Sequence, residues 1–363
     1  MRLALTLAQR AVGRVAPNPP VGCVLVRDGA VVGRGWTSPW GRPHAEARAL
    51  EQAGSAAVGA TAYVTLEPCA HHGATPPCAE ALADAGVARC VVAVRDPDPK
   101  ASGAGIAVLQ NAGVAVTEGV RADDAETVAA SYLTHRRHGR PRVTFKVATS
   151  LDGRIATRTG ASRWITGEAA RRRVHLERAR HDAVMVGSAT AATDDPALTV
   201  RVPGMGDRRP VRIVVDSQVR VPLTHRLFHD VSTHPTIVLT RGDADPARIA
   251  AVNETGASVI PLAADADGRV ALRAGMTALA DHGITSVMVE GGGGLAASLF
   301  NADLIDRVAW FRGGLVLGGD GVPAVAGWGV ETLTQAPGFR CRGHTALDGD
   351  TLEIWDRGAC SRA

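Results

Sequence analysis

The chain has 363 residues, 45% of them hydrophobic and 21% charged, and its net charge of +4 with a pI near 8.9 makes it mildly basic. Length and composition predict a globular protein of about two domains, and the charge is too small to indicate a nucleic-acid partner. Six cysteines are too sparse for a disulfide scaffold, no uncharged apolar run reaches the roughly 18 residues of a membrane span, and 1–14 lacks a signal-peptide cleavage pattern, so we expect a cytoplasmic protein.

Helix and strand patterns alternate through the first half, which predicts a mixed α/β domain over 1–140. Its hairpin is the clearest element, because the apolar runs "VGCVLV" and "AVVGRGW" flank an Asp-Gly turn. The other expected elements are helices near 2–13, 44–52, 76–86 and 123–135, and strands at 62–66, 89–94 and 114–119, with one more helix between the last two strands.

The polar, basic segment "THRRHGRPR" (134–142) contains Gly and Pro and is expected to form the domain boundary. A second α/β domain is expected over 141–363. Its expected strands are 143–148, 183–187, 212–216, 236–240, 259–262, 286–290, 307–311, 315–319 and 351–355, and its expected helices lie near 167–180, 246–252, 271–281 and 295–300. The basic runs at 135–142 and 171–173 favour a solvated surface over a phosphate-binding patch.

Four potential metal ligands lie within the stretch "TLEPCAHHGATPPC" (65–78), namely Cys69, His71, His72 and Cys78. Upstream, "RPHAEARAL" places His44 at the start of a helix, while Cys69 follows a strand and Cys78 falls in the first turn of the next helix. A catalytic zinc needs three protein ligands and one open position, and one imidazole with two thiolates suits zinc better than magnesium or calcium. His44, Cys69 and Cys78 would supply these ligands, and the helix start is expected to favour the thiolate form of Cys78. Buried structural cysteines with a surface histidine are the alternative.

Glu46 lies two residues after His44 and is expected to act as the catalytic acid/base without binding the metal. Zinc lowers the pKa of a bound water toward neutrality, and a nearby carboxylate can then complete proton transfer. The pattern H-x-E followed by P-C and a further cysteine is the signature of the zinc nucleoside and nucleobase deaminases. About two residues separate the cysteines in the short form of that signature, whereas eight separate them here.

The longer spacing, together with "APNPPVGCVLV", "GRPHAEARAL", "GATAYVTLEPCAHHGATPPC" and "VVAVRDPDP" in this order, resembles the bifunctional deaminase–reductase family of riboflavin biosynthesis over almost the whole chain. The resemblance implies a cytidine-deaminase-like three-layer α/β domain followed by a dihydrofolate-reductase-like α/β domain. It also implies that the first domain deaminates a pyrimidine nucleotide, 2,5-diamino-6-(5-phosphoribosylamino)pyrimidin-4-one, and that Glu46 protonates the leaving ammonia.

Two positions of the first domain depart from the family pattern. The family usually has His at the position of Thr37 and Lys or Arg at the position of Ala74, and both would help to bind the ribose-phosphate end of the substrate. Asn18 resembles the family's base-contacting Asn, with a simple turn residue as the alternative. His71 is expected to share the phosphate contact, while His72 is expected at an exposed loop position.

The most informative motif of the second half is "VEGGGGLAASLF" (289–300), in which a strand ends at Glu290, four glycines follow and a helix begins near Leu295. Backbone N–H groups at such a helix start can bind a phosphate or pyrophosphate. A Gly-rich turn without a ligand is the alternative. The motif is not G-x-G-x-x-G and comes late in the chain, which argues against the first turn of a Rossmann fold.

The motifs "TFKVATSLDGRIA", "SRWITG", "SATAATDDPALTVR", "RIVVDS" and "VEGGGGLAASLF" resemble the reductase half of the same family. The resemblance implies hydride transfer from NADPH to the ribose C1 of 5-amino-6-(5-phosphoribosylamino)uracil, which gives the ribityl chain. By position, the residues expected to face the cofactor are Ala148, Trp164, Thr190, Asp194, Gly292, Gly293, Gly294, Leu295, Ala296, Ala297 and Ser298. Those expected to face the substrate are Lys146, Ser162, Arg178, Leu198, Arg201, Ser217 and Glu290.

Lys146 is one of only two lysines in this arginine-rich chain, which hints that an ammonium group itself is needed, with a surface lysine at a strand edge as the alternative. Arg178 suits phosphate through its bidentate fork, with an ordinary helix charge as the alternative. The chain has "GGGG" where the family often has Pro, Ser or Thr after two glycines, and "WFRGGLVLGG" where "AP" and a lysine are commoner. The second departure lies near the C-terminal strands, where the contacts of an expected homo-oligomer, a dimer or a tetramer, could differ.

We therefore expect a two-domain enzyme that uses Zn²⁺ and NADPH on a small-molecule pyrimidine nucleotide, without a nucleic-acid or membrane partner. One alternative is a single-activity deaminase of a nucleoside, a nucleotide or tRNA with a non-catalytic second domain, although a tRNA editor should show a stronger basic face. Another is a zinc-stabilised structural or regulatory protein, which would not need Glu46 beside its metal.

Overall fold

The computed structural model describes residues 1–72, 76–99 and 101–358. The chain divides into two compact units, Met1–Pro141 and Arg142–Ala363, and each is described by itself. Among the described residues, none of the helices combines the length and the apolar character that crossing a membrane would require.

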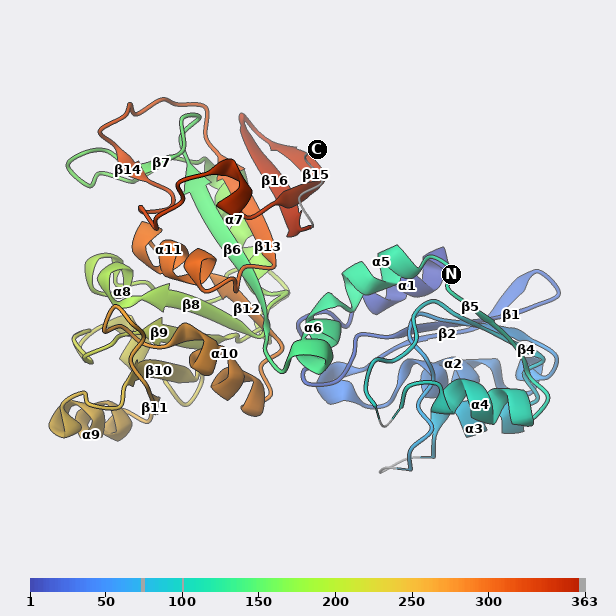
Figure 1. Ribbon diagram of the computed structural model, residues 1–363. Helices are drawn as coiled ribbons and strands as arrows, with labels where there is room; N and C mark the ends of the chain where they lie inside the picture. Colours follow the sequence, from blue (N-terminus) through green and yellow to red (C-terminus); the bar gives the residue numbers. More distant parts are fainter. Residues whose placement is uncertain (73–75, 100, 359–363) are drawn as a thin grey trace. The chain divides into compact units, whose positions relative to one another are not determined.

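The first unit is built on a five-stranded sheet with the order β2-β1-β3-β4-β5 (Figure 1). The strands are β1 (Gly22–Arg27), β2 (Ala30–Trp36), β3 (Thr61–Val64), β4 (Arg89–Val92) and β5 (Ala115–Glu118). β1 runs antiparallel to β2 and to β3, whereas β3, β4 and β5 are parallel. Asp28 and Gly29 both have positive φ and join β1 to β2 in a two-residue turn, as the sequence predicts for an Asp-Gly hairpin.

Helices cover both faces of this sheet, which makes a three-layer unit (Figure 1). They are α1 (Arg2–Ala8), α2 (Ala45–Ala53), α3 (Cys78–Asp84), α4 (Ala104–Asn111), α5 (Ala122–Val128) and α6 (Ala130–His138). The alternation of β1 explains the layers, because Val24 packs in a cluster with α1 while Cys23 and Leu25 pack in a cluster with α2 and α3. The first turns of α2 and α3 lie in this second layer, and together with the loop after β3 they form the site described below.

The second unit contains a nine-stranded sheet with the order β11-β10-β9-β8-β12-β6-β13-β16-β15. Its strands are β6 (Arg142–Thr149), β8 (Ala183–Gly187), β9 (Val211–Val215), β10 (Thr236–Arg241), β11 (Ser258–Leu262), β12 (Ser286–Val289), β13 (Arg307–Arg312), β15 (Phe339–Leu347) and β16 (Asp350–Arg357). The seven strands from β11 to β13 are parallel, and β16 and β15 continue the sheet antiparallel. A separate pair joins β7 (Arg154–Ala156) to β14 (Val322–Pro323).

The two faces of the nine-stranded sheet carry different helices. The helices of the second unit are α7 (Glu168–Arg178), α8 (Ser188–Asp194), α9 (Pro246–Glu254), α10 (Leu272–Asp281) and α11 (Gly293–Asn301). Val287 and Val289 face the layer of α10 and α11, whereas Met288 between them faces α7. Strand β12 lies between β8 and β6, and the strand order reverses at this point. The turn after β12 is therefore at the topological switch point, which is where open α/β sheets bind ligands.

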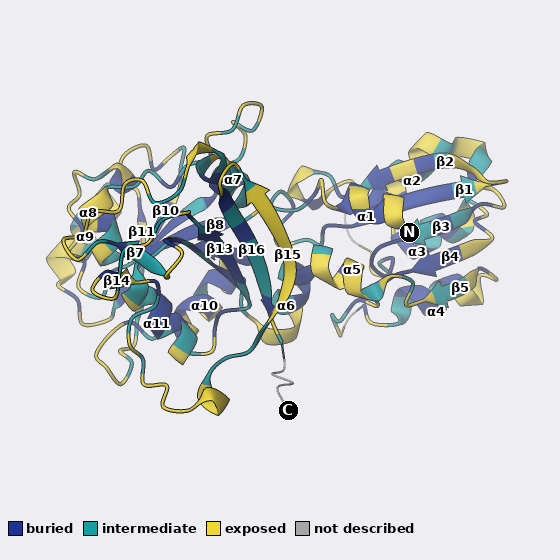
Figure 2. Ribbon diagram, turned by 90° about the horizontal axis from the view of Figure 1, so that it is seen from above, coloured by how far each residue is buried: buried dark blue, intermediate teal, exposed yellow. Residues whose placement is uncertain are grey.

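Several expected elements differ from those observed. The first helix ends at Ala8, and the helix expected over 123–135 is two helices, of which α6 continues to His138 inside the expected boundary segment. The expected strand at 315–319 is wrong, because these residues form no strand. Strand β15 was missed because its residues 340–346 are exposed on both faces and so show no apolar alternation (Figure 2). Helix α8 was missed because seven small and polar residues carry no helical period.

Candidate functional site

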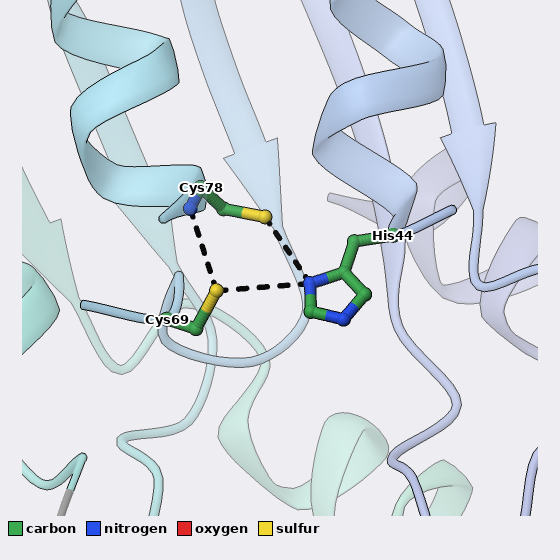
Figure 3. A group of neighbouring side chains, drawn as sticks. All are labelled: His44, Cys69 and Cys78. Atoms are coloured by element: carbon green, nitrogen blue, oxygen red, sulfur yellow. Dashed lines mark hydrogen bonds between the residues drawn. The ribbon is translucent and has the colours of Figure 1, made fainter. Parts of the chain in front are cut away.

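Three potential ligands meet where the first turns of two helices approach the end of β3 (Figure 3). His44 is the residue before α2, Cys78 is the first residue of α3, and Cys69 lies in the loop that follows β3. Their ligand atoms all lie within 4.8 Å of one another, and among the described residues they form the one His, Cys and carboxylate group compact enough to hold a metal. The structure therefore brings together the three ligands that the sequence predicts.

The spacing of these atoms tests whether zinc would fit. His44 Nδ1 lies 3.3 Å from Cys78 Sγ and 3.7 Å from Cys69 Sγ. Tetrahedral zinc with Zn–S of about 2.3 Å and Zn–N of about 2.1 Å would separate N and S ligands by about 3.6 Å. The observed distances lie close to that value, so the triad fits zinc through Nδ1 and the two sulfurs.

The two thiols of the triad share a hydrogen bond, and their pKa values move in opposite directions. The hydrogen bond from Cys78 lowers the pKa of Cys69 to about 4, and the same bond raises the pKa of the Cys78 thiol. The backbone N–H of Cys78, at the start of α3, donates to Cys69 Sγ at 3.3 Å, which also favours the thiolate form of Cys69.

Glu46 lies in the first turn of α2 and is only 3% exposed. Burial raises the pKa of its carboxyl group to about 7, and its interactions with His44 and Cys78 act in the opposite direction. A pKa near neutrality suits a group that must both accept and donate a proton. Glu46 lines the same pocket, of about 400 Å³, as His44 and Cys69.

Asn18 also lines this pocket, and its position depends on a glycine that the sequence analysis did not single out. Gly41 has a φ of +87°, and a Cβ built on it would collide with the amide of Asn18. The residue opposite Asn18 must therefore be glycine for two reasons, its backbone conformation and the close approach of the amide. A glycine between Trp and Arg at the end of a Pro-rich turn was the only signal in the sequence.

We predict that Gly41→Ala displaces Asn18 and weakens substrate binding. We expect the KM for deamination to rise about 10-fold or more, while the zinc content stays unchanged. The reason is that losing the hydrogen bond between the Asn18 amide and the substrate costs roughly 1–2 kcal/mol. Steady-state ammonia release and metal analysis measure the two quantities. Gly59→Ala is the matched control, since its φ is +75° but a Cβ there would meet nothing within 4 Å. Equal effects of the two substitutions would contradict the role of Asn18.

Glu67 is a second residue that sequence reasoning missed. Its carboxylate is 5% exposed and accepts four backbone N–H groups, from Asp96 at 3.2 Å, Gly103 at 3.0 Å, Gly105 at 3.0 Å and Ile106 at 3.3 Å. These bonds hold the loop between β4 and α4, from which Asp96 lines the pocket. Its place two residues before Cys69 was the available signal, but the four partners lie about 30 to 40 residues away and become visible only in the fold.

The residues near the expected ribose-phosphate end have distinct positions. His71 lines the pocket and is exposed, whereas the side chain of His72 is 73% exposed and lies 3.4 Å from Glu80, so His72 sits at the surface as expected. Thr37 is buried, and its hydroxyl donates to the Pro19 carbonyl at 3.0 Å and accepts the Val21 N–H at 2.9 Å. Thr37 therefore holds the loop that carries Asn18. Ala74 lies outside the described residues.

A buried charged cluster marks the carboxyl end of the parallel sheet in the second unit. Arg178 of α7 forms a two-pronged ion pair with Glu290, at 2.5 Å from Nε and 2.9 Å from Nη2, and both side chains are 12% exposed. Burial opposes ionisation of Glu290, but Arg178 and Lys146 outweigh it and hold the pKa of that carboxyl at about 2. Burial lowers the pKa of Lys146, which comes from β6, while Glu290 raises it. The structure thus brings three predicted substrate residues together.

His175, one turn before Arg178, was not predicted and completes this cluster. Its Nδ1 lies 3.1 Å from the Thr199 carbonyl oxygen, to which Arg178 Nη1 also donates at 2.9 Å. The two side chains of α7 therefore anchor the 196–201 segment beside Glu290. Arg201 follows in this segment with an exposed side chain. The i, i+3 spacing of His175 and Arg178 was the only sequence signal.

The Gly-rich turn after β12 forms the start of α11, where the first N–H groups of a nine-residue helix have no partner within the helix. The Gly292 N–H donates to Thr190 Oγ1 at 3.1 Å, which joins the turn to α8. A Cβ at Gly293 would come within 2.9 Å of the Pro323 carbonyl oxygen, whereas one at Gly294 would meet nothing within 4 Å. The turn is therefore packed on one side and open on the other, which fits a bound phosphate.

The other predicted residues of the second unit are less concentrated. Ala148 lies on β6, and Ser162 and Asp194 are exposed. Trp164 is 68% exposed, and the Arg171 guanidinium lies 4.4 Å from the centre of its ring.

Leu198 is 2% exposed in a core cluster, so only its backbone could face a ligand. Ala296 and Ala297 are also buried, Ser298 accepts a bond from Arg269 at 3.1 Å, and Leu295 packs beside Gly291. Ser217, two residues after β9, accepts the Val270 N–H at 3.3 Å.

Two family models match different parts of the chain. The model of the cytidine and deoxycytidylate deaminase zinc-binding region matches residues 1–94, and that of the RibD C-terminal domain matches residues 141–352. The riboflavin biosynthesis protein RibD of Escherichia coli (strain K12) is 42% identical over 353 residues, which cover 94% of each chain. The protein of the same name from Aquifex aeolicus (strain VF5) is 41% identical over 337 residues, which cover 93% of this chain and 91% of the relative.

Solved structures give the same pairing of two units. RibD of Acinetobacter baumannii, form 1, superposes with a TM-score of 0.88 at 35% identity and covers 99% of this chain and 98% of its own. A diaminohydroxyphosphoribosylaminopyrimidine deaminase/5-amino-6-(5-phosphoribosylamino)uracil reductase from Thermotoga maritima superposes with a TM-score of 0.85 at 32% identity, covering 99% and 97% of the two chains. The likeness therefore extends over both sites and not only over the zinc-binding motif.

Proposed function

The chain belongs to the RibD family of bifunctional riboflavin-biosynthesis enzymes, and we propose that its first unit deaminates 2,5-diamino-6-(5-phosphoribosylamino)pyrimidin-4-one while its second unit reduces the ribosyl group of the deaminated product with NADPH. The chain is an enzyme with a zinc-binding deaminase domain and a reductase domain that uses a nicotinamide cofactor. The observation that carries the deaminase half is the triad of His44, Cys69 and Cys78 at zinc spacing beside the buried Glu46.

In the deaminase pocket, the triad would hold zinc, which supplies Lewis acidity next to the reacting ring carbon. Glu46 takes a proton from the attacking water and gives it to the departing amine nitrogen, so the ring gains an oxygen and releases ammonia. Its raised pKa of about 7 makes both transfers accessible near neutrality. Asn18 is placed to orient the ring through its amide, which can donate to one polar edge atom and accept from another.

In the reductase unit, the open side of the Gly292–Gly294 turn would hold the phosphates of NADPH, which supplies a hydride to the ribose C1. Lys146 and Arg178 supply positive charge for the phosphorylated substrate, and Glu290 fixes the orientation of Arg178 through two hydrogen bonds. The burial of this cluster strengthens its electrostatic interactions. These roles make Lys146 and Arg178 substrate-binding residues and Glu290 the group that positions them.

The proposal also includes a cytoplasmic location and a homo-oligomer, a dimer or a tetramer. A reducing compartment is supported by the free thiols that the zinc triad needs. An oligomer is supported by β15, a nine-residue strand whose outer edge pairs with no other described strand.

The two activities can be tested separately on the purified full-length chain. With the diaminopyrimidine nucleotide, we expect ammonia release that stops when a chelator removes zinc and returns when zinc is restored. With the deaminated nucleotide supplied directly, NADPH oxidation should continue in the chelated protein, because no residue of the triad belongs to the second unit. Absence of NADPH oxidation under these conditions would contradict the reductase half. Undiminished ammonia release from zinc-free protein would contradict the metal assignment.

A further inference from the structure

The deaminase pocket has a wall formed by α6 and by the loop after β4. Asp96, Asp98, Tyr132 and Arg136 line this wall, together with Ala101. The Tyr132 hydroxyl donates to Asp96 at 3.0 Å, and Arg136 Nη1 lies 3.5 Å from Asp98 Oδ2. The guanidinium of Arg136 also lies 5.3 Å from the centre of the Tyr132 ring. Two neighbouring contacts therefore orient Arg136 within the pocket wall.

The acidic side chains that line this pocket lie next to the metal triad or accept hydrogen bonds from other groups of the protein. Glu46 lies next to the metal triad, Glu67 accepts four backbone N–H groups, and Asp96 accepts the Tyr132 hydroxyl. The hydroxyl of Thr37 is bound to backbone groups on both its donor and acceptor sides. Among the described lining residues, permanent positive charge comes only from Arg42 and Arg136.

We infer that Arg136, with Arg42 as its partner, binds the phosphate group of the deaminase substrate and makes this site select a phosphorylated nucleotide over the corresponding nucleoside. The inference rests on the proposed function for the identity of the substrate. A phosphate dianion in a partly enclosed pocket needs charged donors, and a planar guanidinium can give two parallel N–H bonds to its oxygens. A guanidinium has more N–H donors than the contacts of Arg136 with Asp98 and Tyr132 can use, so further N–H groups remain for this purpose.

Arg136 and the metal triad belong to different elements of the first unit. The metal triad is held by α2, α3 and the loop after β3, whereas Arg136 comes from a helix some sixty residues further along the chain. His44, Cys69 and Arg136 all line the same pocket. A change at Arg136 should therefore alter how tightly the substrate binds without touching the residues that perform the proton transfer.

The first test compares the nucleotide with its dephosphorylated nucleoside as deaminase substrates of the zinc-loaded, full-length chain. Arg136→Gln should raise the KM for the nucleotide about 10- to 100-fold, the range expected for the loss of a charged hydrogen bond. The KM for the nucleoside should stay within about 3-fold of the wild-type value. Arg136→Lys keeps the charge but not the fork, so its KM should be intermediate.

Arg137→Gln is the matched control. Arg137 is the next residue of α6 and pairs with Glu126 at 2.8 Å at the surface, and it does not line the pocket. This variant should behave as the wild type with both substrates. If Arg136→Gln raises the two KM values equally, the residue supports α6 and does not recognise phosphate, and an unchanged nucleotide KM in an active enzyme likewise overturns the inference.

A binding measurement separates this inference from the proposed function. Ribose 5-phosphate should bind to the zinc-loaded chain by calorimetry, and Arg136→Gln should lose one class of sites that Arg137→Gln retains. The wild type could release no ammonia while the two variants still differ in ribose 5-phosphate binding. That result would contradict the proposed substrate and support the phosphate site. Equal binding of ribose 5-phosphate by wild type and Arg136→Gln would overturn the phosphate site whether or not ammonia is released.

Discussion

Replacing Glu46 with glutamine is expected to lower the kcat for ammonia release by about 10²–10⁴-fold, the usual contribution of a positioned acid/base. Glutamine has nearly the same shape as glutamate but can neither take a proton from water nor give one to the leaving amine nitrogen. Glu46 is 3% exposed and lines the pocket with His44 and Cys69, so bulk water cannot easily replace it. Ammonia release under saturating substrate is the measurement.

The zinc content of the Glu46→Gln variant should remain that of the wild type, because Glu46 is not among the three grouped ligand residues. NADPH oxidation with the deaminated nucleotide should also be unchanged. Glu51→Gln, on the exposed side of the same helix, is the control for a general effect of losing a carboxylate from α2. Retention of normal ammonia release by Glu46→Gln, or loss of zinc from it, would show that the acid/base assignment is wrong.

Replacing Glu290 with glutamine is expected to destabilise the second unit and to lower its kcat/KM by about 100-fold or more. The substitution leaves Arg178 charged and only 12% exposed, without the carboxylate that pairs with it. Removing one member of a buried ion pair typically costs about 3–5 kcal/mol, and a small misplacement of a substrate-binding group can cost about 100-fold in rate. Urea denaturation and NADPH oxidation with the deaminated nucleotide measure the two effects.

The pH dependence of this destabilisation follows from the pKa of Glu290. Arg178 helps to hold that pKa at about 2, below the usual value of 4.5 for a glutamate, so the unfolded carboxyl group binds its proton first as the pH falls. The stabilisation is therefore complete above about pH 5 and is lost progressively toward pH 2. The difference in unfolding free energy between wild type and Glu290→Gln should shrink over this interval.

Glu168→Gln provides the comparison for this second experiment. Glu168 pairs with Arg172 on α7, but both side chains are about 70% exposed, and such surface pairs contribute at most about 1 kcal/mol. Its stability should therefore differ little from that of the wild type at any pH. A Glu290→Gln variant as stable as Glu168→Gln would contradict the importance of the buried pair.

Local patterns in the sequence were sufficient for the features that depend on neighbouring residues. The Asp-Gly hairpin, the helix starts that carry His44 and Cys78, and the Gly-rich turn before α11 all appear in the structure, and the cytidine-deaminase-like and dihydrofolate-reductase-like fold classes are confirmed by the family matches. Such elements follow from turn chemistry, apolar periodicity and motif spacing, which lie within a few residues of each other. Where periodicity was absent, as in α8 and β15, the elements were missed.

Local patterns were therefore enough to predict the family, the two fold classes and the grouping of His44, Cys69 and Cys78. The side chains that meet across long sequence separations become visible only in the folded chain. Arg178 meets Glu290 across 112 residues, Glu67 collects the N–H groups that hold the pocket loop, and Arg136 enters the deaminase pocket from α6. The physical reason is that these contacts depend on the packing of helices onto the sheets, which fixes side-chain directions that no local pattern specifies.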